Sequence, residues 1–127
     1  MNTAITTSHA PAAIGPYSQA IACGGLVFIS GQLPIDPATG KLIEAPIANR
    51  TRQVLRNIEA IATAAGGELA GIVKTTIFLT DLADFQAVNR AYGEFFPTTP
   101  PARSTVQVAA LPLGSNIEIE AILQLPG

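Results

Sequence analysis

The feature that most constrains the fold is a change in the spacing of apolar residues along the chain. Between residues 46 and 65, apolar side chains recur every three or four positions, which is typical of an amphipathic helix. They are Ile47, Val54, Ile58, Ile61 and Ala65. Pro46 suits the first turn of this helix, and Gly66-Gly67 ends it. The flanking segments are rich in β-branched and aromatic residues, so the core has to combine helices with strands.

The N-terminal third predicts strands and turns. The runs "QAIAC" and "LVFIS" lie on either side of Gly24-Gly25, a dipeptide that tolerates the positive φ angles of a two-residue hairpin turn. "DPATGK" at 36–41 predicts another turn, in which Pro37 fixes φ and Gly40 takes the left-handed position. "AITT" near the N-terminus is interpreted as an additional edge strand.

After the long helix, "GIVKTTIFLT" predicts a strand that is buried on much of both faces. Asp81 is the expected N-cap of a second helix, which "PTTPP" ends. One side of this helix is lined by Phe85, Val88, Tyr92 and Phe95 or Phe96. The last two strands are "STVQVAA" and "IEIEAILQL", so the order is β-β-β-α-β-α-β-β. Each helix connection is long enough for parallel pairing, which predicts an α+β domain with a mixed β-sheet.

Length and composition limit the classes of function. At 127 residues the chain is one domain, residues 1–127. Charged residues make up 13% and apolar residues 48%, which predicts that part of the surface is covered in an oligomer. The net charge of −2 provides no basic surface for nucleic acid or anionic lipid.

The setting and the absence of a zinc site are also expectations from the sequence. "MNTAITTSHAP" does not have the pattern of a signal peptide, and no apolar run is long enough to span a bilayer. The single cysteine, Cys23, excludes an intrachain disulfide and favours the cytoplasm. Cys23 and the single histidine, His9, lie far apart in the sequence, so we expect no zinc site.

Arg103 stands at the start of an apolar strand, in "PPARSTVQV". Because side chains alternate along a strand, Thr105 and Gln107 share its face, while Ser104 and Val106 take the other. Two helices cover one face of such a sheet. We expect the uncovered face to hold Arg103, facing away from the interior of the monomer and in contact with another subunit.

The last strand alternates in the same way. Ile117 and Ile119 lie on its core face, while Glu118 and Glu120 lie on the other. We therefore expect a pocket between subunits to hold Arg103 and a glutamate within reach of each other, and two interpretations of Arg103 remain open. One is a surface ion pair, worth about 0 to 1 kcal/mol. The other is recognition of an anion, because a guanidinium binds a carboxylate through two parallel hydrogen bonds.

Several stretches resemble the RidA/YjgF family of imine deaminases. They are "APAAIGPYSQA" (10–20), "VFISGQLPIDPATG" (27–40), "FLTDLADFQAVNRAYGEFF" (78–96), "PPARSTVQVAALP" (100–112) and "IEIEAI" (117–122). They occur in the family's order and cover most of the chain. The resemblance implies a chorismate-mutase-like α+β fold, with two helices on one face of the sheet, and a homotrimer with active sites between subunits. It also implies hydrolysis of 2-iminopropanoate and 2-iminobutanoate to 2-oxo acids and ammonia, without a cofactor or a metal.

The resemblance also implies roles for individual residues. Arg103 is similar to the arginine that binds the substrate carboxylate, and Glu118 to the residue that positions and activates the attacking water. The implied catalytic set is Arg103, Glu118 and Thr105, and the implied substrate-binding set is Tyr17, Ser30, Gly31, Asn89, Arg103 and Ser104. Glu120 is the competing candidate for activating the water. Without the resemblance, Tyr17 reads as a turn aromatic, Ser30 as a strand-end hydroxyl and Asn89 as a satisfied helix amide.

One position departs from the family pattern. The family usually has "PARSC", whereas Thr105 replaces the cysteine here. If the family role depends on backbone groups at this position, activity is retained, and if it depends on a thiol, activity is lost. We favour the backbone role, because imine hydrolysis needs a positioned water and no covalent nucleophile.

Other functions remain as alternatives. The same trimer fits a non-catalytic protein that binds carboxylate metabolites or regulates through them, and Thr105 gives this some weight. RNA cleavage or inhibition of translation, reported in the wider family, fits poorly with the acidic balance of the chain. A pericyclic mutase would rest on fold analogy alone.

Overall fold

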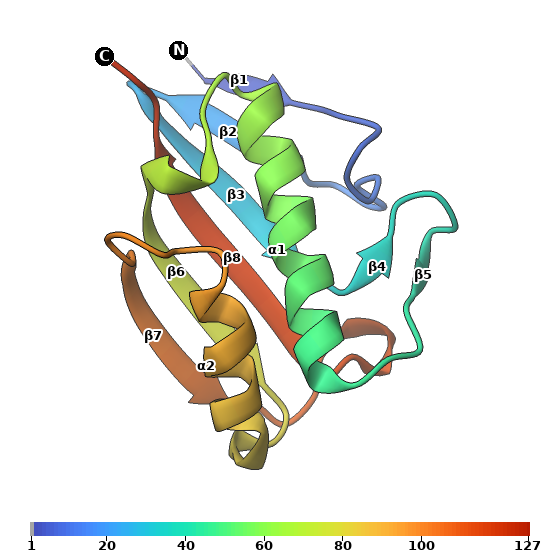
Figure 1. Ribbon diagram of the computed structural model, residues 1–127. Coiled ribbons are helices and arrows are strands. Elements are labelled where there is room, and N and C mark those ends of the chain that lie inside the picture. The colour runs from blue at the N-terminus through green and yellow to red at the C-terminus, as the bar shows by residue number, and fades with distance from the viewer. Residues whose placement is uncertain (1) are drawn as a thin grey trace.

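The computed structural model describes residues 2–127 and has the predicted order of helices and strands, with one small hairpin added. The elements are β1 (Thr3–Ile5), β2 (Ala20–Cys23), β3 (Leu26–Gln32), β4 (Ile35–Asp36), β5 (Lys41–Leu42), α1 (Ile47–Ala64), β6 (Ile72–Leu79), α2 (Phe85–Gly93), β7 (Ala102–Gln107) and β8 (Ile117–Gln124). Six strands form one mixed sheet in the order β1-β2-β3-β8-β6-β7. Both helices lie on the same face of this sheet (Figure 1), which confirms the predicted α+β arrangement.

The two predicted turns are both present. Gly24 and Gly25 have φ angles of 58° and 86° and join β2 to β3 as a two-residue hairpin. The turn at 37–40 joins β4 to β5, with Gly40 at a φ of 72°. The sequence does not predict the strands β4 and β5 of this hairpin, because strands of two residues are too short to show an alternating pattern.

The crossovers place β8 in the middle of the sheet. The crossover through α2 joins β6 to β7, and these strands pair in parallel as expected. The crossover through α1 leads to β6 without pairing it to β3, because β8 lies between them and is antiparallel to both. The long-range pairing of the last strand therefore separates strands that are neighbours in the sequence.

The core lies between the helices and one face of the sheet. Val54, Ile58 and Ile61 of α1 are buried, as the predicted helix requires. Ile117 and Ile119 of β8 are also fully buried and form part of the same core cluster.

Within residues 2–127, no helix covers the other face of the sheet (Figure 1). This face mixes charged with apolar side chains, such as Glu118 and Glu120 with Phe28. Phe28 and Val106 on this face are 45% and 42% exposed. Strand β6, predicted to be buried on much of both faces, alternates instead between buried and partly exposed residues. Exposed aromatic and aliphatic groups on one sheet face are typical of a surface that meets another protein.

The start of the second helix differs from the prediction. The Asp81 carboxylate accepts a hydrogen bond from the Ala83 backbone N–H at 2.9 Å, so Asp81 caps a short 3₁₀ turn over Leu82–Asp84. Helix α2 begins after this turn, at Phe85. A capping side chain therefore marks the first turn of this segment but not the register of the α-helix that follows.

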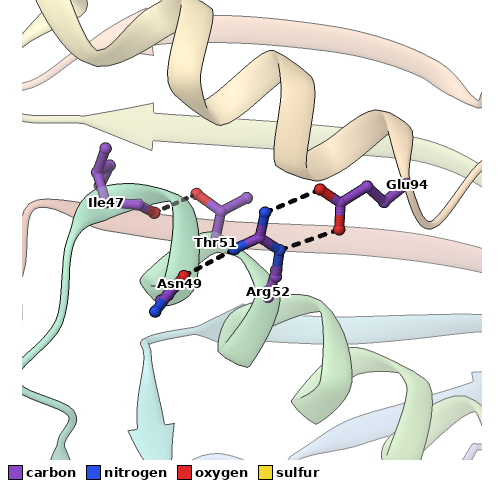
Figure 2. Close-up of polar contacts among 5 residues, drawn as sticks. All are labelled: Ile47, Asn49, Thr51, Arg52 and Glu94. Carbon is purple, nitrogen blue, oxygen red and sulfur yellow. Dashed lines mark hydrogen bonds and ion pairs between the residues drawn. The ribbon is translucent and has the colours of Figure 1, made fainter.

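The guanidinium of Arg52 joins α1 to the end of α2 through two parallel hydrogen bonds, which we call the fork (Figure 2). Arg52 donates to both carboxylate oxygens of Glu94, from Nε at 3.0 Å and from Nη2 at 2.8 Å. Its Nη1 donates to Asn49 Oδ1 at 2.7 Å. Hydrogen bonding from Arg52 lowers the pKa of the Glu94 carboxyl below its ordinary value.

This ion pair is exposed to solvent, so we expect it to contribute little to stability. The Glu94→Gln variant should lower Tm at pH 7 by about 3 °C or less. Because the pKa of Glu94 is lowered in the folded protein, the pair's contribution is present above the ordinary pKa of a glutamate and is lost as the pH falls through the lowered value. Calorimetry at two pH values measures both effects, with Glu59→Gln, an exposed change on α1, as the control. A loss of 10 °C or more would show that the fork is structurally essential.

Candidate functional site

Arg103 lies at the edge of the sheet and packs under α2. It is aligned with Thr75 of the neighbouring strand β6, and Thr75 is buried on the helix side. The guanidinium carbon of Arg103 is 5.0 Å from the ring centroid of Tyr92 and 5.6 Å from that of Phe85, both on α2. The prediction that Arg103 faces away from the monomer's interior was therefore wrong. Alternation shows which residues share a face, but it does not show which face the helices cover.

Glu118 lies on the opposite face of the sheet. It is aligned with Phe78 of β6, while its neighbours Ile117 and Ile119 point into the core. Strand β6 also separates β8 from β7, which carries Arg103. The expectation that a glutamate shares a face with Arg103 was therefore wrong. One copy of the chain holds these two groups on opposite sides of its sheet.

The predicted site residues accordingly fall into separate groups. The first is the arginine group, which we define as Arg103, Thr105 and Asn89. Thr105 follows Arg103 on the same face of β7, aligned with Ile77 of the core. Asn89 lies one helical turn after Phe85, on the side of α2 that holds the Arg103 contacts.

Two polar atoms of the arginine group lack hydrogen-bond partners in the described part of the chain. Asn89 Oδ1 and Thr105 Oγ1 are buried, and neither has a hydrogen-bond partner among residues 2–127. In the same range the one ion pair is that of Arg52 with Glu94, so Arg103 has no carboxylate partner. Buried polar atoms without partners are costly. The arrangement is therefore that of a polar site that a ligand or another chain completes.

The second is the glutamate group, which we define as Glu118, Gly31 and Tyr17. Strand β3 contains a β-bulge at Ser30-Gly31, because Ile29 pairs with Ala121 and Gln32 pairs with Ile119. The bulge brings the backbone of Gly31 against Glu118. A Cβ at position 31 would lie 2.6 Å from Glu118 Oε2, so only glycine leaves room for this carboxylate.

A hollow of about 270 Å³ adjoins the glutamate group. Tyr17 and Gly31 line it, together with Leu33, Pro112 and Leu113. Tyr17 is 54% exposed, and Leu113 has a φ of 59°, which is uncommon for a residue other than glycine. The hollow is largely apolar, and the side chains at its mouth are open to solvent.

Two predicted site residues lie outside both groups. The Ser30 hydroxyl donates to the Ser18 carbonyl oxygen at 2.6 Å, and this bond ties the bulge to the N-terminal loop. Ser104 is exposed and is aligned with Thr76, so it lies on the face of the sheet opposite Arg103. In a single chain, the structure therefore gives Ser30 a structural bond and leaves Ser104 apart from the arginine.

The surroundings of Glu118 make its carboxylate a stronger base. Burial raises the pKa of the Glu118 carboxyl above its ordinary value, and the charge of Glu120 raises it further. Glu120 itself is exposed and lines a different hollow of about 250 Å³, with Phe28 and Lys74. Of the two glutamates, it is Glu118 that is partly buried and lies against the backbone of Gly31.

Within residues 2–127, no set of three or more His, Cys, Asp and Glu side chains lies close enough together to hold a metal ion. Over the same residues, neither helix combines the length and the apolar character that crossing a membrane requires. Cys23 is an exposed free thiol.

The sequence did not identify the aromatic surroundings of the arginine. The sequence predicts Phe85 and Tyr92 only as the apolar side of a helix, and Thr75 only as part of a buried strand. The sequence feature that could indicate these surroundings is the spacing of Phe85, Asn89 and Tyr92, which places an amide side chain between two rings on one helix face. Nothing in the sequence indicates that this face lies over Arg103.

Comparisons with known proteins agree with this fold. A family model described as endoribonuclease L-PSP matches residues 7–124. RutC family protein y4sK of Sinorhizobium fredii is 54% identical, over 95% of this chain and 96% of that protein. The 2-iminobutanoate/2-iminopropanoate deaminase of Homo sapiens is 48% identical, over 93% of this chain and 86% of the human protein.

A solved structure is similar as well. The crystal structure of E. coli TdcF with bound serine has a TM-score of 0.93 and 45% identity, and covers 98% of this chain and 99% of that one. The family match and the relatives therefore extend over nearly the whole chain. The chain belongs to the RidA/YjgF family, whose model carries the description endoribonuclease L-PSP.

Proposed function

We propose that this protein is a hydrolytic deaminase of 2-imino acids that works as a homotrimer with its sites between subunits. One observation carries the proposal: within residues 2–127 Arg103 has no carboxylate partner, and it lies on the face of the sheet opposite to Glu118. In a closed ring, the sheet edge at β7 of one copy, which carries Arg103, lies against the Glu118 face of the next. Closed rings of this kind repeat one heterologous contact, so every contact holds a site.

The surface of the chain supports self-association. The uncovered sheet face exposes Phe28 and Val106, and only 13% of the residues are charged. Burying such a face removes apolar area from water, which is the main favourable term in association. The same association covers the exposed Tyr17 of the glutamate group and the neighbouring Leu113.

The proposed chemistry uses both groups of residues. Arg103 binds the carboxylate of the imino acid through paired hydrogen bonds and so orients the C=N carbon. The imine reacts in its protonated form, C=NH₂⁺. Glu118 holds a water and accepts one of its protons as the oxygen attacks the imine carbon, which gives an amino alcohol. Glu118 passes this proton to the nitrogen, the C–N bond breaks, and the hydroxyl group loses its proton to Glu118 as the C=O bond forms. Glu118 releases that proton to the departing ammonia, so the products are a 2-oxo acid and an ammonium ion, and the carboxylate is restored. Water is the only co-reactant, so the balance needs no cofactor.

Similarity to the human relative, which is named a 2-iminobutanoate/2-iminopropanoate deaminase, supports this reaction class. The expected substrates are therefore small 2-imino acids, and the products are 2-oxo acids. The exposed free thiol of Cys23 fits the reducing conditions of the cytoplasm. The test is to generate 2-iminopropanoate in place and follow its loss by trapping with semicarbazide. Faster loss with enzyme supports the proposal, and an unchanged rate rejects it.

A second candidate function is binding of carboxylate metabolites without turnover. It is favoured by Thr105, which stands where the family usually has cysteine, and by the solved relative that holds serine. The two functions differ in the same assay. A binding protein would gain thermal stability from a 2-oxo acid but would not speed the loss of the imine. Cleavage of RNA, which the family description names, has no support in a chain of net charge −2.

The raised pKa of Glu118 predicts a pH dependence. As a base Glu118 must be ionised, so kcat/KM should fall as the pH drops through its pKa, after subtraction of the uncatalysed rate. The Glu120→Gln variant removes one cause of the raised pKa, so its acid limb should move to lower pH. An acid limb that stays in place in this variant would contradict the assignment.

Protonation of Glu118 has opposite effects on activity and on stability: it lowers the activity but favours the folded state. Because the folded protein holds this proton more tightly than the unfolded chain, the contribution of Glu118 to stability is fully present below the ordinary pKa of 4.5 and is lost as the pH rises through the raised value. Glu118→Gln should therefore abolish turnover at pH 7 without lowering Tm. A fall in both would indicate that the carboxylate is structural.

A further inference from the structure

Arg103 is held by two aromatic rings rather than by a carboxylate. Its guanidinium carbon lies 5.0 Å from the Tyr92 ring centroid and 5.6 Å from the Phe85 ring centroid. The one ion pair within residues 2–127 involves a different arginine, Arg52. The rings attract the cation through its flat face, whereas a carboxylate would bind the N–H groups at its edge. The rings therefore orient Arg103 while leaving its N–H donors available.

The Tyr92 ring is itself fixed in place. Tyr92 is 4% exposed, and its hydroxyl lies 2.7 Å from Thr75 Oγ1 on β6. The Phe96 ring packs against it with centroids 4.8 Å apart. Thr75 is in turn aligned with Arg103 across the β6–β7 pair. The hydroxyl contact thus connects the Tyr92 ring to β6, the strand beside Arg103, and fixes the position of the ring relative to the arginine.

The ring stays uncharged around neutral pH. Burial raises the pKa of the Tyr92 hydroxyl above its ordinary value of 10.0, although the Thr75 hydrogen bond and the charge of Arg103 lower it in part. A neutral phenol does not compete with an external carboxylate for the N–H groups of Arg103. An acidic residue in the same place would satisfy the arginine within the chain and remove its affinity for anions.

We propose that Phe85 and Tyr92, with Tyr92 anchored by Thr75, form an aromatic seat that positions Arg103 to bind a substrate carboxylate. The inference rests on the proposed function, in which Arg103 binds that carboxylate. Phe85 and Tyr92 are positioning residues: they act through Arg103. The spacing of seven residues between them on α2 places both rings on one helix face, with Asn89 between them.

The test measures binding of pyruvate, a 2-oxo acid product, and the KM and kcat for 2-iminopropanoate. Phe85 is 37% exposed, so Phe85→Leu removes the ring at little cost to the core. We expect it to raise the Kd for pyruvate and the KM by about 5- to 10-fold, with a smaller effect on kcat. Phe85→Tyr keeps an aromatic face and should restore binding to within about 2-fold. Tyr92→Phe keeps the ring but loses the Thr75 contact, and about a 3-fold rise in Kd is expected.

The matched control is Phe95→Leu, a change to an aromatic residue that packs at the edge of the core and is separate from Arg103. It should leave Kd and KM within about 2-fold of the unsubstituted protein. Circular dichroism and size-exclusion chromatography check that each variant folds and assembles. The inference is overturned if Phe85→Leu binds pyruvate as tightly as the unsubstituted protein. It is also overturned if Phe85→Leu and Phe95→Leu weaken binding equally, or if Phe85→Tyr fails to restore binding.

An Arg103→Ala arm separates failure of the inference from failure of the proposed function. If Arg103→Ala loses pyruvate binding while Phe85→Leu does not, only the aromatic seat is rejected. If pyruvate does not bind the unsubstituted protein, or binds Arg103→Ala equally well, the carboxylate-binding role is rejected and the inference with it. Loss of binding in Arg103→Ala and in Phe85→Leu, with rescue by Phe85→Tyr, supports both.

Discussion

Replacing Arg103 with alanine is expected to reduce kcat/KM for 2-iminopropanoate on the order of 10²- to 10³-fold, because a paired, charge-assisted contact with the substrate is lost. Arg103→Lys should recover only a small part of this, since an ammonium group does not reproduce the planar fork of a guanidinium. Ammonia release and imine loss, measured together, give the rate. Arg103 makes no ion pair within residues 2–127, so its loss should change Tm little.

Arg52→Ala is the matched control for this prediction. It also removes an arginine, together with the bonds to Glu94 and Asn49, but it does so away from both groups of site residues. Its rate should equal that of the unsubstituted protein. Undiminished turnover in Arg103→Ala would remove the arginine from the mechanism, and an equal loss in Arg52→Ala would mean that the effect comes from charge or folding in general.

Adding one methyl group at Gly31 is expected to have the second large effect. In Gly31→Ala, the new Cβ would lie 2.6 Å from Glu118 Oε2 and 2.8 Å from its Cδ, so the carboxylate has to move. The end of a glutamate side chain moves easily, so we expect a small change in Tm. A displacement of about 1 Å at a catalytic group can lower the rate about 100-fold, and we expect a loss of that order in kcat.

The control for Gly31→Ala is Gly93→Ala at the end of α2. A Cβ there meets no atom within 4 Å, and alanine favours a helix over glycine by about 0.5–1 kcal/mol. Gly93→Ala should therefore retain full activity and unfold at the same or a higher temperature. Full activity in Gly31→Ala would show that the position of Glu118 beside Gly31 is unimportant for the reaction. A collapse of Tm would show that the bulge serves stability.

Much of the fold follows from local patterns in the sequence. The helix-period spacing over 46–65 gives α1 within one or two residues, and Gly24-Gly25 gives the β2–β3 hairpin. The alternation in "IEIEAILQL" places Ile117 and Ile119 in the core and Glu118 outside it. These features depend on residues that are close together in the chain, and local chemistry fixes them.

The geometry of the site depends on pairings that are distant in the sequence. Alternation cannot tell which face of the edge strand β7 lies under α2, and this choice separates Arg103 from Glu118. The bulge at Ser30-Gly31 becomes visible only when β3 is aligned with β8, about 90 residues later. The resemblance supplied the residues of both groups, whereas the sequence alone did not show that a single chain keeps the groups apart.

Mixing two inactive variants tests the central claim most directly. Arg103→Ala and Glu118→Gln chains are co-expressed in equal amounts, purified together and assayed with 2-iminopropanoate, beside each variant alone. If every site combines Arg103 of one copy with Glu118 of the next, random assembly leaves about a quarter of the sites with both native residues, and activity returns to about that fraction. If the mixed assemblies remain as inactive as either variant alone, the two residues do not meet between copies, and the account is contradicted.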